Sequence, residues 1–200
     1  MSDLKNYFDA YLKALKKELG DYEIPKLIME LVAFDIKMQG KYYHERFVLR
    51  KDEDVIRYLL EANGVKEHAI KKISEKLVVF ADADVSGGVY AFWLAECQKA
   101  EDAPIVWLSS EGDQEVVASN IEAFVILLTT GKEYFRLDDE DLNDYVTELP
   151  AFRKWVKEHL KLNPLTQDEE REHIQNHAKE TYQRPFNNWL RNNGAGYLVG

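Results

Sequence analysis

The feature that most constrains the fold is a set of apolar runs in the middle of the chain, joined by short connections. Three of them are residues 77–82, 89–94 and 104–108, and a shorter one follows at 116–118. The long runs are apolar at successive positions, as expected of central strands that are covered on both faces. Every connection has fewer than ten residues, whereas a crossover between parallel strands needs about a dozen. We therefore predict an antiparallel β-meander.

Patterns typical of amphipathic helices precede this predicted sheet. Apolar residues recur at spacings of three and four over residues 3–19, and Gly20 is placed as a stop. A second helix is predicted after Pro25, and periodicity leaves open whether residues 33–38 prolong it or begin a strand. A short helix with start and stop signals is predicted within residues 51–64.

Helical patterns also follow the predicted sheet. Ser119 and Glu122 have capping-box spacing at the start of an apolar helix, and residues 138–193 are helical in pattern throughout. The sequence thus predicts an α+β fold, with a central antiparallel β-meander, N-terminal helices and a helical C-terminal extension. We place the main domain at residues 1–137 and the extension, packed on the same domain, at 138–200.

The charge of the chain restricts its partners. The 36 acidic and 26 basic residues give a net charge of −10, which opposes general binding to nucleic acid or to anionic membranes. A basic protein is the partner that complements this negative charge. The N-terminal segment lacks the apolar stretch of a signal peptide or a membrane span. A single cysteine, Cys97, excludes a disulfide within the chain, so we expect a protein of the reducing cytoplasm.

The stretch between the first two predicted strands could be a metal loop, a catalytic loop or a turn. Asp82, Asp84, Ser86 and Gly87 match four positions of a calcium-binding loop. However, Trp93 stands where that loop needs a bidentate glutamate, and the flanks are strands rather than helices. A turn requires only that the polar side chains bond to nearby backbone and that the glycine pair supplies positive φ angles. We favour the turn and expect no bound metal.

Two catalytic alternatives use carboxylates or histidines. Asp82 or Asp84 could face an acid of residues 111–113 across one end of the sheet, and a glycosidase needs two carboxylates roughly 5 to 10 Å apart. No histidine or lysine accompanies them, so we favour chance proximity. His173 and His177, one helical turn apart, could hold zinc, but exposed histidines on a polar helix are the simpler interpretation. We expect no catalytic residues and no cofactor.

Acidic residues gather in the predicted connections of the sheet. Residues 95–115 contain six acids and one base, Lys99, which gives this segment a net charge of −5. Such a segment would steer a basic protein toward it and raise the association rate roughly tenfold or more. A solvated acidic face without a partner is the alternative. The residues that we predict to contact a partner are Asp84, Glu101, Asp102, Glu111, Asp113 and Glu115.

A further group of acids and three aromatic residues are also candidates for a binding surface. A second acidic cluster consists of Asp138, Asp139, Glu140, Asp141 and Asp144. Three aromatic residues of the predicted strands could anchor an interface, although strand positions favour a place in the core. These are Tyr90, Trp93 and Trp107.

Residues 77–131 resemble the central pattern of the SUKH superfamily, which contains bacterial immunity proteins and fungal cell-wall regulators. The resemblance is most specific at residues 104–112 and 118–124 and at Gly87, Gly88, Tyr90, Phe92 and Trp93. It implies an α+β fold without catalytic residues. It also implies a binding role, because immunity proteins of this superfamily neutralise toxins, often nucleases, by binding them.

The charge pattern and the resemblance together predict a non-enzymatic immunity protein that occludes a basic toxin domain. Two alternatives remain open. One is a metal-dependent or acid–base hydrolase that uses carboxylates of the turns at the sheet end. The other is a regulatory scaffold protein, which the sequence does not separate from an immunity protein.

Overall fold

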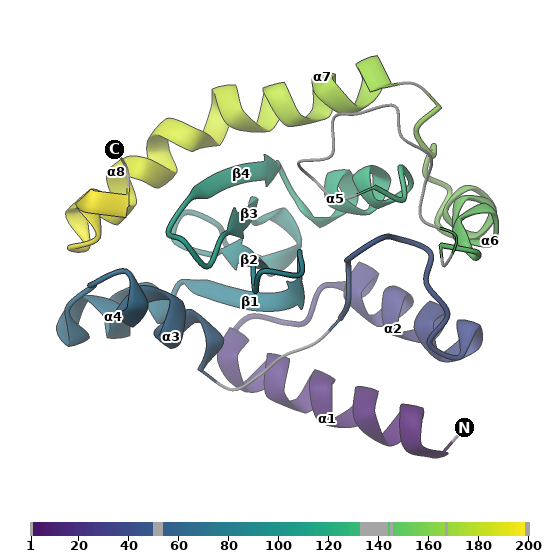
Figure 1. Cartoon of the computed structure of the whole chain (residues 1–200), viewed down its shortest axis with the longest axis horizontal. Coiled ribbons are helices and arrows are strands. Elements are labelled where there is room, and N and C mark those ends of the chain that lie inside the picture. Colours follow the sequence, from purple (N-terminus) through teal and green to yellow (C-terminus); the bar gives the residue numbers. More distant parts are fainter. Residues whose placement is uncertain (1, 50–53, 133–143, 145, 167, 199–200) are drawn as a thin grey trace.

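A computed structural model describes residues 2–49, 54–132, 144, 146–166 and 168–198. Helices α1 (Ser2–Leu19), α2 (Lys26–Met38), α3 (Val55–Ala62) and α4 (Glu67–Ser74) precede a sheet of four strands. The strands are β1 (Leu77–Asp82), β2 (Val89–Trp93), β3 (Ile105–Leu108) and β4 (Gln114–Ala118). Helices α5 (Ile121–Leu128), α6 (Leu149–Trp155), α7 (Asp168–Ala178) and α8 (Arg184–Asn192) follow (Figure 1).

The sheet confirms the predicted antiparallel meander. Its strand order is β1-β2-β3-β4, and each neighbouring pair is antiparallel. Phe92 pairs with both Val78 and Ile105, which fixes the register of the central strand. The fourth strand begins at Gln114, two residues before the predicted run. With helices before and after the sheet, the α+β class is confirmed.

Helices cover both faces of the sheet, so that the molecule has two apolar cores. Val78, Phe80 and Phe92 point toward one core, which α1, α2, α5 and α6 complete. Val79, Ala91 and Trp93, at alternate positions, point toward the other core, which α3, α4 and α8 complete. Figure 1 shows the same arrangement, with α3, α4 and α8 on one side of the strands and α2, α5 and α6 on the other. Alternation along a strand therefore explains why the runs are apolar throughout.

A helix also lies along each edge of the sheet. In Figure 1, α7 runs over β4 and α1 lies beyond β1. The hydroxyl of Tyr11 in α1 donates to the carbonyl of Phe80 at 3.0 Å. After α7, Gln183 accepts a 2.7 Å hydrogen bond from the backbone N–H of Val116 in β4. Side chains of helices thus satisfy backbone groups that a further strand would otherwise pair.

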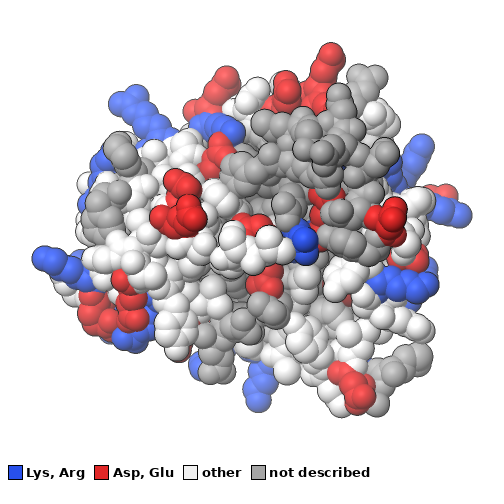
Figure 2. Space-filling view, in the orientation of Figure 1, with Lys and Arg blue, Asp and Glu red and all other residues white. Residues whose placement is uncertain are grey.

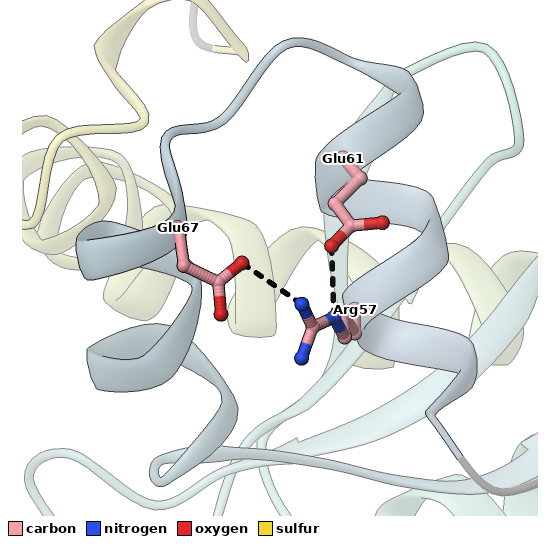
Figure 3. A network of polar contacts seen from close by, with 3 residues as sticks. All are labelled: Arg57, Glu61 and Glu67. Carbon is pink, nitrogen blue, oxygen red and sulfur yellow. Dashed lines mark hydrogen bonds and ion pairs between the residues drawn. The ribbon is translucent and has the colours of Figure 1, made fainter.

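Helix α4 was not predicted from the sequence. Its apolar residues Ala69, Ile70 and Ile73 are buried in the second core, and their spacing of three and four was the available signal. An ion-pair network joins it to α3 (Figure 3). Arg57 donates to Glu61 at 2.8 Å and to Glu67, in the first turn of α4, at 3.0 Å.

Several helix boundaries refine the predictions. Residues 33–38 continue α2 as a helix. The cap of α5 is Asn120, whose side chain accepts from the N–H of Ala123 at 2.9 Å, so the predicted capping box at Ser119 is wrong. Helices α7 and α8 are joined without a break by the π-helical turn Lys179–Gln183.

The predicted domain boundary between residues 137 and 138 lies outside the described residues. None of the helices in the described part of the chain combines the length and apolar character that crossing a membrane requires.

Candidate functional site

The β1–β2 connection is a turn built on Asp84. One carboxylate oxygen, Oδ1, accepts from the N–H of Ser86 at 2.9 Å, from its hydroxyl at 2.6 Å and from the N–H of Gly88 at 2.9 Å. The other, Oδ2, accepts from Trp107 Nε1 at 3.1 Å. Gly87 has a φ of +94°, whereas Gly88 is needed for space, because a Cβ there would overlap the Asp84 carboxylate. Only one glycine of the pair therefore supplies the predicted positive φ.

These hydrogen bonds keep Asp84 ionised. Partial burial raises the pKa of its carboxyl, but the bonds from Ser86, Gly88 and Trp107 outweigh that effect and hold the pKa below its ordinary value. The carboxylate thus orders the turn, and a turn is the interpretation that the sequence favoured over a metal loop. Among the described residues, no three His, Cys, Asp or Glu side chains come together in a way that could hold a metal ion.

The β3–β4 turn lies beside the β1–β2 turn. A Cβ built on Gly87 would be 4.0 Å from the Cβ of Ser110. Within the β3–β4 turn, the hydroxyl of Ser109 accepts from the N–H groups of Glu111 (3.2 Å) and Asp113 (2.9 Å). Both acidic side chains are exposed. The structure therefore brings Asp84, Glu111 and Asp113 to one end of the sheet.

A third segment, residues 42–48, borders the same end. Val48 and Asp82 form a β-bridge, with the N–H of Asp82 donating to the carbonyl of Val48 at 2.9 Å. Buried His44 orders the segment, because its Nδ1 accepts from the N–H groups of Arg46 (3.3 Å) and Phe47 (3.1 Å). Burial, together with the nearby charge of Arg171, lowers the pKa of His44 to about 3, despite a hydrogen bond with the backbone of Lys132.

Exposed apolar side chains surround the β1–β2 turn. The exposed fractions are 49% for Tyr42, 37% for Val48 and 73% for Val85. With Glu45, Arg46, Asp82 and Asp84, these residues line a hollow of about 340 Å³. We define the turn-end surface as Tyr42, Val48, Asp84, Val85, Glu111 and Asp113. The sequence reasoning missed its apolar members, although a valine between polar residues in a turn was a usable signal at position 85.

Of the other three predicted contact residues, two lie at the opposite end of the sheet and one lies on β4. Glu101 and Asp102 belong to the β2–β3 connection at the opposite end of the sheet. Glu101 accepts from the N–H of Lys26 at 3.0 Å and so caps α2, whose preceding residue, Pro25, makes no side-chain cap. Glu115 lies on β4 and pairs with Lys179. Glu101 and Asp102 therefore do not form one surface with the turns, whereas Glu115 stands opposite Trp107, next to the β3–β4 turn.

The other candidate residues lie in or against the cores, on α7 and in loops. Tyr90 and Trp93 are buried in the cores, and Trp107 is partly buried against Asp84. His173 and His177 are exposed on α7. Burial raises the pKa of the Cys97 thiol, and Asp102 raises it further, while Lys76 lowers it. Of the second acidic cluster, Asp144 is exposed and the other members lie outside the described residues.

On one face of the molecule, charge alone does not mark a site among the described residues. On the face shown in Figure 2, acidic and basic side chains are interspersed over the elements rather than gathered by sign. Comparison with protein-family models, with curated proteins and with solved structures finds no match to this chain.

Proposed function

We propose that this chain is a non-enzymatic binding protein, and specifically an immunity protein of SUKH type that occludes a basic toxin domain. The observation that carries the proposal is the turn-end surface. It combines solvent-exposed Tyr42, Val48 and Val85 with the acidic side chains of the two adjacent turns. Apolar centres with charged surroundings are typical of protein interfaces.

The faces and edges of the sheet are covered, which supports binding of a partner at one end of the sheet. Both faces are buried in the two cores. At the edges, Tyr11 bonds to the carbonyl of Phe80 and Gln183 to the N–H of Val116. We therefore do not expect a partner to add a strand to the sheet. Of the two ends, the one at Glu101 also carries Lys76 and Lys99, which offset two of its three acids, Asp21, Glu23 and Glu101.

The turn-end surface can supply both affinity and steering. Burying the exposed parts of its apolar side chains would stabilise a complex by roughly 1–2 kcal/mol for each residue. The carboxylates of Glu111 and Asp113 are exposed, so their field reaches solvent. They would accelerate association with a basic protein, and salt would weaken that effect.

The negative charge of this surface supports one class of partner. A nuclease binds phosphates through clusters of Lys and Arg, and a surface with apolar and acidic side chains complements such a cluster. An inhibitor bound there would exclude the nucleic acid. The resemblance of residues 77–131 to SUKH sequences supports the same proposal, since this stretch supplies both turns. The single cysteine is consistent with action in the cytoplasm.

The proposal is tested by capturing the partner and assaying its toxicity. The chain serves as bait in a lysate of its native cell, and captured proteins are identified by mass spectrometry. We expect a basic protein domain that stops growth when expressed alone and is harmless when expressed with this chain. A captured partner without toxicity would contradict the immunity function and favour a scaffold.

The location of the interface is tested with charge reversals. We expect the double variant Glu111→Lys/Asp113→Lys to associate with the captured partner about tenfold more slowly at low salt, and the difference to shrink at high salt. The matched control is Glu172→Lys/Glu180→Lys, which makes the same charge change on the exposed surface of the C-terminal helices. Equal slowing by both variants would reject the turn-end surface.

A further inference from the structure

The hollow beside the β1–β2 turn has a defined chemical character. Tyr42, Val48 and Val85 give it apolar walls that are open to solvent. Its charged lining residues are Asp82, Asp84, Arg46 and the buried Glu45, and Asp82, Glu45 and Arg46 already interact with other groups of the chain. Its volume of about 340 Å³ is at the lower end of the range for small-molecule pockets, roughly 300 Å³. A single long side chain is an occupant of suitable size.

The Asp84 carboxylate gives this hollow a fixed anionic group. Its Oδ1 is engaged by three donors of the turn, which hold the group in place. Its Oδ2 accepts from Trp107 Nε1, and a carboxylate oxygen has two lone pairs. This oxygen therefore retains capacity for a further donor while its position is already ordered.

We propose that the hollow binds one arginine side chain of the basic partner, an inference that rests on the proposed function. The aliphatic stem of an arginine packs against Val48 and Val85, its guanidinium plane stacks on Tyr42, and an N–H group of its head donates to Asp84 Oδ2. Arginine fits better than lysine because its head is planar, stacks on aromatic rings and is weakly hydrated.

The experiment uses a small probe, so that it does not depend on the partner. N-acetyl-L-arginine methylamide is titrated into the ¹⁵N-labelled chain, and amide chemical shifts are recorded by NMR. The uncharged citrulline analogue and the lysine analogue serve as comparison ligands. We expect saturable shifts at Val48, Val85 and Gly87 with the arginine probe, and binding about threefold or more weaker with either analogue.

Variants distinguish the hollow from general charge attraction. Val85→Ser removes an exposed apolar wall and is expected to weaken binding of the arginine probe about threefold. Tyr58→Ser is the control, because Tyr58 is 65% exposed on α3 and does not line the hollow, and this variant should bind the probe as the wild type does. Shifts spread equally over Glu101 and Glu111, equal binding of citrulline, or preference for lysine would each overturn the arginine assignment.

The experiments distinguish failure of the arginine site from failure of the proposed function. If the captured toxin depends on Glu111 and Asp113 but the arginine probe does not shift the hollow, only the arginine assignment fails. If the probe binds in the hollow but no toxin is captured, the proposed function fails and the arginine site stands.

Discussion

Asp84 and His44 order the two segments that flank the hollow by the same physical means. Asp84 Oδ1 accepts from the N–H groups of Ser86 and Gly88, two and four residues further along the chain. His44 Nδ1 accepts from the N–H groups of Arg46 and Phe47, two and three residues further along. Side chains that bond in this way fix a loop without a regular ladder. The turn-end surface is therefore ordered by single residues, and a change at either one should alter its shape.

His44 makes the stability of the protein depend on pH. Its pKa is about 3 in the folded protein, against 6.5 for an ordinary histidine. Above about pH 6.5 the ring is neutral in both states. Below that value the unfolded chain takes up a proton that the folded protein does not, so the free energy of unfolding falls as the pH drops toward 3.

We predict that His44→Asn, which keeps an acceptor but does not titrate, removes this dependence. Urea unfolding is measured for the wild type and the variant at about pH 7 and about pH 5. The free energy of unfolding of the wild type minus that of the variant should fall by about 2 kcal/mol from about pH 7 to about pH 5. An advantage that stays constant would show that His44 becomes protonated without cost in the folded protein.

Residue roles were predictable from the sequence only where both partners are close in the chain. The bonds from Ser86 and Gly88 to Asp84 span two to four residues, and the turn was predicted. Glu101 caps α2 from 75 residues away, and Glu115 pairs with Lys179. No local pattern indicates those partners, so these structural roles of the two acids were not predicted. Which residues contact a partner stays a prediction.

At the scale of elements, the segment that follows α7 completes the sheet. Gln183 accepts from the N–H of Val116 and donates to Gln114 at 2.9 Å and to Asn187 at 2.8 Å. The π-helical turn Lys179–Gln183 lies against β4 and contains this glutamine. A side chain amide thus takes the place of a neighbouring strand.

We predict that Gln183→Ala lowers the free energy of unfolding by about 1–3 kcal/mol, because the buried N–H of Val116 loses its acceptor. Asn188→Ala, exposed on α8, is the matched control and should change stability by less than about 0.5 kcal/mol. Urea unfolding gives the energies, and amide hydrogen exchange should accelerate specifically at Val116. Unchanged exchange at Val116 would contradict this role for Gln183.

Strands were easier to predict than helix boundaries. The predicted runs 77–82 and 89–94 are bounded by charged or glycine-containing turns, and the strands Leu77–Asp82 and Val89–Trp93 confirm them to within one residue. Helix α4 is short and strongly charged, so its buried residues Ala69, Ile70 and Ile73 form only a weak pattern. The cap of α5 depends on backbone angles, which placed Asn120 rather than Ser119 at the helix start.

At the scale of the whole molecule, meander topology decides which loops meet. The first and third connections of a meander lie at one end of the sheet and the second at the other. This rule, available from the sequence, places Asp84 with Glu111 and Asp113, and it separates Glu101 and Asp102 from them. Net charge is a property of the entire chain and carries no such positional information. The exposure of Tyr42 and Val48 depends on tertiary packing that the sequence pattern did not show.

The second core joins residues from distant parts of the chain, which predicts cooperative unfolding. Phe186 of α8 is fully buried, with its ring centroid 5.2 Å from that of Trp93 in β2. We predict that Phe186→Ala lowers the free energy of unfolding by about 3–5 kcal/mol. Tyr58→Ala, at a largely exposed site, should have little effect.

Tryptophan fluorescence and circular dichroism should report one coincident transition in the wild type. Two separate transitions would mean that α8 unfolds independently of the sheet.

The bonds from Tyr11 to Phe80 and from Gln183 to Val116 also bear on self-association. Amyloid growth and strand exchange between copies both begin when an outer strand recruits another chain. Here that recruitment first has to displace a side chain of the same molecule. We therefore expect concentrated solutions to stay free of fibrils as long as the two flanking helices remain docked.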